Sequence, residues 1–302
     1  MVDWHLGYVT RDSGNKMVAW NLGGEAVSID LVESHQAHLS VLVEALEKSP
    51  YDQLVSQYAR FSEGLDGVHR GAPSSSSSKE EMDRLPVLLD SFLSAFRAFV
   101  DHTCKWISGR YGDAVLRGFN ANLSREYDSE FAYRFMYKLR NYSQHCGLPP
   151  VSGRVRRWID PNGVKWQEVS VTFDAMELLS KYDGWGQPVK AELQRMEGQF
   201  SVAEIAARLM FSCSIVHAEL VCAIAPNLQE SADFLIECDR SPEGSEFVPA
   251  LFGISPDEWR DPQASRDIQF RFIRPELAHL LALSLRQARR VLSLSRDSGD
   301  PT

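Results

Sequence analysis

The amino-acid sequence predicts a mainly helical protein of 302 residues with two short β-hairpins. Through most of the chain, apolar residues recur every three or four positions, which is the periodicity of helices packed on a core. Residues 1–28 and 151–173 differ, because both contain short strand-like runs on either side of a Gly- or Asn-containing turn. These observations predict a helical bundle accompanied by two antiparallel ribbons.

The same patterns divide the chain into four regions. They are an N-terminal β-hairpin at 1–28, a helical region at 29–150, a β-hairpin at 151–173 and a C-terminal helical region at 174–302. Inside the first helical region, residues 71–79 read GAPSSSSSK. This low-complexity stretch has nothing to bury, so we expect a flexible linker or an exposed loop there.

The individual helices follow from the apolar spacing and its breaks. We expect helices at 29–46, 51–61, 80–111, 113–124 and 131–146, one or two short helices within 173–196, and helices at 201–224, 227–238 and 268–294. Ser201 and Glu204 form a capping box at the start of one of them. Residues 247–262 are rich in proline, and we expect them to be irregular.

The charge of the chain bears on whether the protein can bind nucleic acid. The net charge of −9 argues against a protein that coats nucleic acid non-specifically. Between Arg134 and Glu168, however, the sequence has seven Lys or Arg residues and only two acidic residues, which gives this segment a net charge of +5. The chain is therefore acidic as a whole but contains one basic segment.

The sequence indicates a cytoplasmic protein without metal or cofactor. Its most apolar stretch, 200–226, is interrupted by charged residues and fits a buried helix better than a membrane span, and no secretory signal precedes it. Five scattered cysteines suit free thiols in a reducing compartment. Cys213 and His217 lie one turn apart, but no second ligand pair accompanies them, and we expect a core histidine. No nucleotide-binding motif is present.

The most informative stretch is the helix that ends near Gly147. Phe131, Phe135, Leu139, Tyr142 and Cys146 form its apolar stripe, and Gly147, Pro149 and Pro150 stop it. Its polar arc carries Tyr133, Arg134, Tyr137, Asn141 and Gln144, with Arg140 at one border and His145 at the other. These two border residues are about 140° apart on an ideal helix, so one phosphate could meet both only through a long side chain, a distorted last turn or a second copy.

Arg140, Asn141 and His145 fit the pattern R-[N/D/H]-x3-H, and the helix around them resembles the motif helix of the HEPN superfamily. The resemblance implies an all-helical, paired protomer acting as a metal-independent ribonuclease, as in several toxins and phage-defence effectors. It further implies a homodimer, RNA as substrate, and an antitoxin or sensor protein as possible partner.

The residue types suit such chemistry. A histidine can move the 2′-hydroxyl proton near neutral pH, arginine can clamp the phosphate, and Asn141 lies one turn before His145, where it can orient the ring. We expect further RNA contacts from Arg134, Lys138, Arg156, Arg157, Trp158 and Lys165. With a tight turn, Trp158 would face Lys165 and Arg157 would face Trp166. These pairs could instead only stabilise the ribbon through cation–π contacts.

Two other functions remain open. In one, the chain is a non-catalytic interaction or sensor module, His145 caps the last carbonyls of its helix, and Arg140 pairs with a carboxylate. In the other, scattered histidines and carboxylates form a metal-dependent hydrolase. A catalytic motif should be accessible to solvent, whereas a structural one should be buried and bonded to neighbouring groups.

Overall fold

The computed structural model describes residues 3–47, 49–70, 76–159, 165–196, 198–244, 246–254 and 269–297. It confirms a mainly helical protein and separates the chain into two compact units. Unit 1 comprises residues 1–47 and 221–293, and unit 2 comprises residues 48–220 and 294–302. This division differs from the predicted one, because the first helix belongs with the N-terminal hairpin and the C-terminal region is split between the units.

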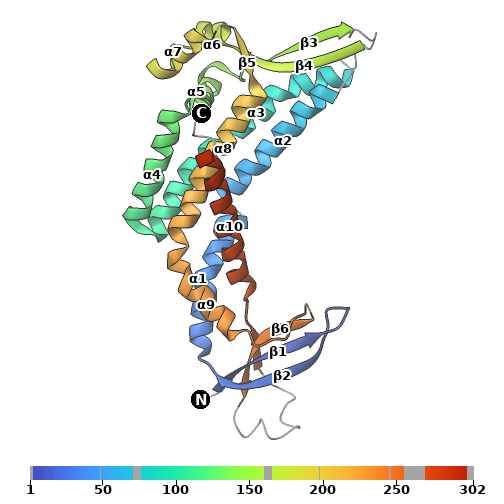
Figure 1. Ribbon diagram of the computed structural model, residues 1–302, viewed down its shortest axis with the longest axis vertical. Helices are drawn as coiled ribbons and strands as arrows, with labels where there is room; N and C mark the ends of the chain where they lie inside the picture. Colours follow the sequence, from blue (N-terminus) through green and yellow to red (C-terminus); the bar gives the residue numbers. More distant parts are fainter. Residues whose placement is uncertain are drawn as a thin grey trace. The chain divides into compact units, whose positions relative to one another are not determined.

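Unit 1 is built on a four-stranded antiparallel sheet (Figure 1). The strands are β1 (Asp3–Arg11), β2 (Met17–Ala26), β6 (Phe247–Ile254) and β7 (Gln269–Phe272), in the order β2-β1-β6-β7. The helices are α1 (Ile29–Glu47), α9 (Pro226–Cys238) and most of α10 (Glu276–Asp297). The predicted N-terminal hairpin is confirmed, but it is one half of a larger sheet rather than a separate element.

Strand β6 corrects the expectation of irregular structure for residues 247–254, whereas residues 255–262 of that predicted stretch lie outside the described residues. It pairs with β1 on one side and β7 on the other, and its last six residues are buried. A central strand buried on both faces reads as a continuous apolar run, so it lacks the alternation that marks an exposed strand. The predicted helix at 268–294 is likewise shorter, because β7 occupies its start and α10 begins after Pro275.

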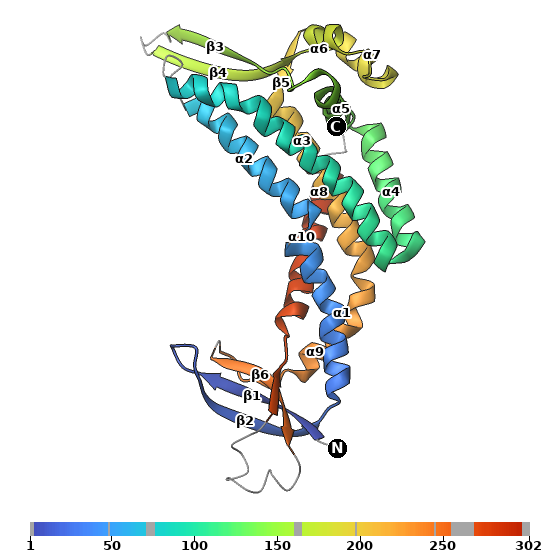
Figure 2. The same cartoon turned by 180° about the vertical axis from the view of Figure 1, so that it is seen from behind.

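Unit 2 contains the motif helix within a helical bundle. Its elements are α2 (Pro50–Arg70), α3 (Ser76–Arg110), α4 (Gly112–Ser129), α5 (Phe131–Cys146), β3 (Ser152–Ile159), β4 (Lys165–Asp174), α6 (Ala175–Lys181), α7 (Gln187–Arg195), β5 (Gln199–Ser201) and most of α8 (Val202–Ile224). Figure 2 shows α3 between α2 and α4. Helix α3 packs along α2 and also contacts α4 and α5. Most of the aromatic ring contacts among the described residues lie in this unit, and several of these rings, such as Phe96, Phe135 and Trp185, are buried in its core.

Several local predictions for unit 2 are confirmed, and others change. Ser201 Oγ accepts a hydrogen bond from Glu204 N, as expected at the start of α8. The post-motif hairpin is present and gains β5 as a third strand, in the order β3-β4-β5. Part of the predicted Ser-rich loop, 71–75, lies outside the described residues, while 76–79 belong to the first turns of α3.

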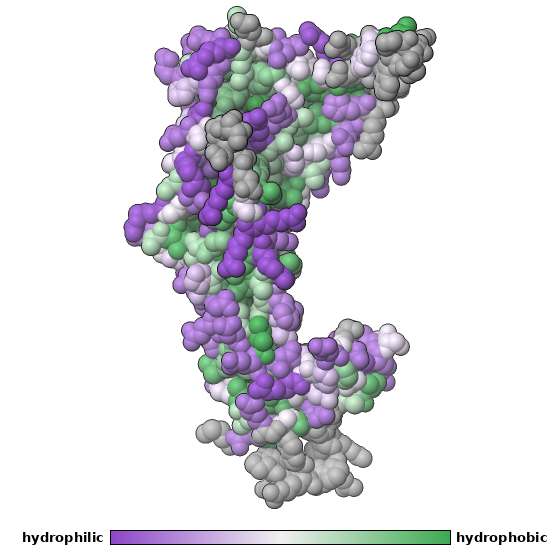
Figure 3. Space-filling model, in the orientation of Figure 1, coloured by the Kyte–Doolittle hydropathy of each residue, from purple (hydrophilic) through white to green (hydrophobic). Residues whose placement is uncertain are grey.

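Helix α8 is the one described helix long and apolar enough to cross a membrane. More than half of its most apolar window is buried inside the protein, and Leu209, Cys213 and Val216 are fully enclosed. Hydrophilic and hydrophobic residues are interspersed on the face of each unit seen in Figure 3. The burial of α8 agrees with the buried core helix that the sequence predicts.

Candidate functional site

The first half of α5 is buried on nearly every side. Phe135 stacks on Trp185 at 5.6 Å between ring centroids and meets Phe173 edge-on, while Tyr133 meets Phe96 of α3 edge-on. Because neighbours cover opposite faces of this half, Tyr133 and Arg134 are buried, although both were expected on a polar surface. The predicted polar arc is therefore restricted to the second half of the helix.

The helix ends as the sequence predicts. Cys146 is its last residue, and Gly147 follows with φ of 107° and ψ of −168°. Side chains other than hydrogen rarely tolerate this region, which explains the glycine at the stop. Cys146 itself is exposed, so the apolar stripe ends at Tyr142 and the last turn projects into solvent.

Arg134 has a structural position rather than an RNA-facing one. Its Nη2 lies 2.5 Å from Glu192 Oε1 of α7, and its Nη1 donates to the carbonyls of Tyr127 and Asp128 at 2.7 Å each. The side chain is 10% exposed. Because these bonds within the protein occupy its guanidinium, Arg134 is a structural residue and not the RNA contact that the sequence predicts.

Arg140 has the opposite environment. The residue is half-buried, and its Nε and Nη1 are closed to solvent, yet neither nitrogen has a hydrogen-bond partner. The carboxylate expected for a structural arginine is absent among the described residues. Buried charged groups are normally paired, so this guanidinium is prepared for an anion that the chain does not itself supply.

His145 and Asn141 complete the motif on the same helix. His145 is exposed in the last turn and Asn141 is half-buried one turn earlier. No hydrogen bond within the described ranges shows His145 capping the helix. Both residues lie on α5, where positions five apart are about 140° from one another on an ideal helix, so the helix itself does not direct the two groups to one side.

Two residues that the sequence did not single out also belong to this region. Ser143 lies three positions after Arg140, and its buried Oγ has no partner. Arg97 of α3 donates to Tyr137 Oη at 2.8 Å, and its guanidinium lies 5.2 Å from the centroid of the Tyr137 ring. Arg97 also pairs with Asp101 of the same helix at 2.9 Å, so its charge is offset within α3. No pattern local to residues 131–150 could have revealed its contact with the motif helix.

The remaining expected RNA contacts are distributed over two places. Lys138 Nζ lies over Gly186, 3.6 Å from the position that a Cβ would take there. Arg154 and Trp158 are exposed on β3. The side chains of Arg156, Arg157 and Lys165 lie outside the described part of the structure.

The backbone register of the hairpin differs by one residue from that of a tight turn. Trp158 pairs with Trp166 and Arg157 with Gln167, so the expected Trp158–Lys165 and Arg157–Trp166 pairs do not form. The connection spans 160–164, and its extra residue moves each partner by one position.

His217 behaves as a core histidine. Its ring stacks on Tyr51 with centroids 3.9 Å apart, and burial lowers its pKa to about 4. Cys213 is fully buried, and burial raises the pKa of its thiol. Among the described residues, no group of three His, Cys, Asp or Glu side chains is placed to hold a metal ion.

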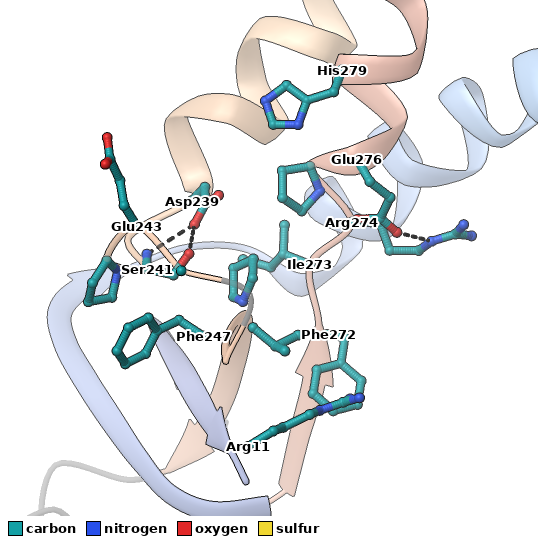
Figure 4. Close-up of a pocket in the computed structure, with 15 residues that line it drawn as sticks. Arg11, Asp239, Ser241, Glu243, Phe247, Phe272, Ile273, Arg274, Glu276 and His279 are labelled. Carbon is teal, nitrogen blue, oxygen red and sulfur yellow. Dashed lines mark hydrogen bonds and ion pairs between the residues drawn. The ribbon is translucent and has the colours of Figure 1, made fainter. Parts of the chain in front are cut away.

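Unit 1 contains a separate cavity of about 790 Å³, drawn in Figure 4. Phe247, Phe272 and Ile273 contribute apolar walls, and Arg11 lies 5.1 Å from the Phe272 ring centroid. Asp239 accepts from Ser241, and Arg274 pairs with Glu276 at 2.9 Å. Arg274 and Glu276 thus offset each other's charge, and none of the motif residues lines this cavity.

Comparison of the chain with protein-family models, curated proteins and solved structures gave no match. The residues of α5 and their surroundings are therefore the features of this chain that indicate a function.

Proposed function

We propose that the protein is a metal-independent endoribonuclease of HEPN type, acting in the cytoplasm as a bacterial toxin or phage-defence effector. The observation that carries this proposal is that Arg140 Nε and Nη1 are buried and unpaired on the helix whose last turn carries the exposed His145. A purely structural motif would show Arg140 bonded to a carboxylate and His145 bonded to carbonyls. Neither bond is found in the described part of the chain.

The proposed reaction is an internal transesterification. The 2′-oxygen of a ribose attacks the adjacent phosphorus, the bond to the 5′-oxygen of the next nucleotide breaks, and a 2′,3′-cyclic phosphate and a 5′-hydroxyl result. One histidine removes the 2′-proton, and an acid returns a proton to the leaving 5′-oxygen. Arg140 offsets the charge that develops on the phosphate. Asn141 orients the imidazole of His145 or the phosphate.

A homodimer provides both proton-transfer groups and accounts for the geometry. Arg140 and His145 lie on different sides of α5, so we propose that two protomers each contribute one motif to a shared cleft. Lys138 and Arg154 would then guide the RNA backbone by charge, and Trp158 by stacking. An antitoxin or a sensor protein is the partner class expected to restrain such an enzyme.

The decisive experiment incubates the purified protein with structured RNA in EDTA. We expect fragments with 2′,3′-cyclic phosphate ends from the wild type and none from His145→Ala. Equal cleavage by both proteins would refute the assignment of His145. Induction in a host provides a second measurement, since the wild type should arrest growth and His145→Ala should not.

The cavity of unit 1 favours a second candidate, a ligand-binding or sensor module. Its volume of about 790 Å³ lies within the range of small-molecule sites, and its walls combine aromatic rings with the imidazole of His279. Under this function the protein would bind a ligand without cutting RNA. The RNA experiment above separates the two candidates directly.

A further inference from the structure

Unpaired buried polar atoms concentrate at one place on α5. Among the described residues, Arg140 Nε, Arg140 Nη1 and Ser143 Oγ are such atoms. Residues three apart on a helix lie on neighbouring positions of one face, with Cβ atoms about 5–6 Å apart. Native proteins leave few buried polar groups unpaired, and two adjacent side chains with this property indicate a missing common partner.

The hydroxyl of Ser143 differs from those of comparable helical serines. Ser91, Ser129, Ser214 and Ser284 each donate to the carbonyl four residues earlier, at 2.8–2.9 Å. This internal bond is the usual way for a serine to satisfy its hydroxyl within a helix. Ser143 makes no such bond, so its O–H remains available to an acceptor from outside the helix.

Arg140 differs in the same way from the other arginine buried on α5. Arg134 donates to the Glu192 carboxylate and to two backbone carbonyls. Arg140 Nε and Nη1 donate to nothing. Both Arg140 and Ser143 are donors, so the group that would satisfy them together must be an acceptor with several oxygens. A tetrahedral oxyanion meets this requirement, and arginine is well suited to it.

We propose that Ser143 and Arg140 form one oxyanion site, and that its ligand is a phosphodiester of the RNA backbone. This inference rests on the proposed function, to which it adds Ser143 as a phosphate-binding residue. Because the donor atoms are closed to solvent, the phosphate enters through a change in the Arg140 rotamer.

Binding of inorganic phosphate to the full-length protein, followed by calorimetry and by thermal shift, tests the site without any cleavage assay. We expect saturable stabilisation of the wild type. Ser143→Ala should bind phosphate about tenfold more weakly, because one hydrogen bond to a charged group is lost. Its melting temperature without phosphate should not fall, because the removed hydroxyl has no internal partner.

Ser284→Ala is the matched control. It removes a hydroxyl that bonds to the carbonyl four residues earlier in α10, and its phosphate affinity should equal that of the wild type. The site is refuted if Ser143→Ala also binds phosphate like the wild type. It is equally refuted if that variant melts several degrees lower without ligand, since its hydroxyl would then have an internal partner.

A short RNA carrying 2′-O-methyl groups, which cannot be cleaved, tests the nature of the ligand. It should show the same tenfold loss with Ser143→Ala. Binding of phosphate but not of this RNA would refute the phosphodiester and leave a free oxyanion as ligand. If the protein cuts no RNA while anion binding depends on Ser143, the nuclease proposal fails and the site stands. If RNA is cut and Ser143→Ala binds phosphate like the wild type, the oxyanion site fails and the nuclease proposal stands.

Discussion

Arg134 and Glu192 form a buried ion pair that joins α5 to α7, with 2.5 Å between Nη2 and Oε1. The same guanidinium also donates to two carbonyls at the end of α4. One side chain thus holds three elements of unit 2 around the base of the motif helix. Six positions later, Arg140 has none of these partners, and this contrast separates a structural arginine from a candidate catalytic one.

Replacing Arg134 should destabilise the protein. Arg134→Met leaves Glu192 and two carbonyls without their donor, and the loss of one partner from a buried pair costs about 3–5 kcal/mol. Glu192 is 22% exposed, so we expect the lower end of this range. Urea unfolding measures the free energy change. Arg208→Ala, which breaks the exposed pair with Glu204, should change it by at most about 0.5 kcal/mol. Similar small effects of both substitutions would contradict the structural role.

Replacing Arg140 should give the opposite pattern. Arg140→Met keeps an apolar stem and removes a guanidinium whose Nε and Nη1 are unpaired, so the melting temperature should stay level or rise. RNA cleavage should fall at least about a hundredfold, the scale expected when one transition-state donor is lost. A drop of several degrees in melting temperature would show instead that Arg140 supports the fold.

Burial of His217 predicts loss of stability in acid. Burial favours the neutral ring and lowers the pKa from 6.5 to about 4, so the unfolded chain binds a proton first as the pH falls. This contribution is fully present above pH 6.5. It should decrease by about 3 kcal/mol as the pH approaches 4.

His217→Phe tests this pH dependence. Phenylalanine retains the stacking on Tyr51 and cannot be protonated, so its free energy of unfolding should vary less between pH 7 and 4.5 than that of the wild type. Parallel pH curves for the two proteins would rule out His217 as the cause.

Arg154 should contribute to RNA affinity through charge alone. The residue is exposed on β3, so Arg154→Ala should leave the melting temperature within about a degree. If Arg154 contacts a phosphate, the substitution should weaken binding across RNA sequences and reduce the salt dependence of the affinity by about one counterion. Fluorescence anisotropy at several salt concentrations measures both quantities. An unchanged salt slope would exclude the contact.

The sequence predicted those structural features that depend on residues close to one another along the chain. Gly147 stops α5, Ser201 caps α8, and both hairpins lie where turn residues interrupt the helical spacing. These features are set by backbone conformation and by hydrogen bonds within a few residues. The polar pattern of residues 140–145 on α5 could also be recognised from the sequence, since it depends only on spacing.

Tertiary structure decided which polar side chains are free. Arg134 and Arg140 have the same charge on the same helix, yet only the fold brings Glu192 to one and leaves the other unpaired. The fold also gave β6 two partner strands and made the N-terminal hairpin part of a sheet with residues more than two hundred positions away. Such pairings depend on contacts between distant segments, and spacing along a single chain cannot encode which segments meet.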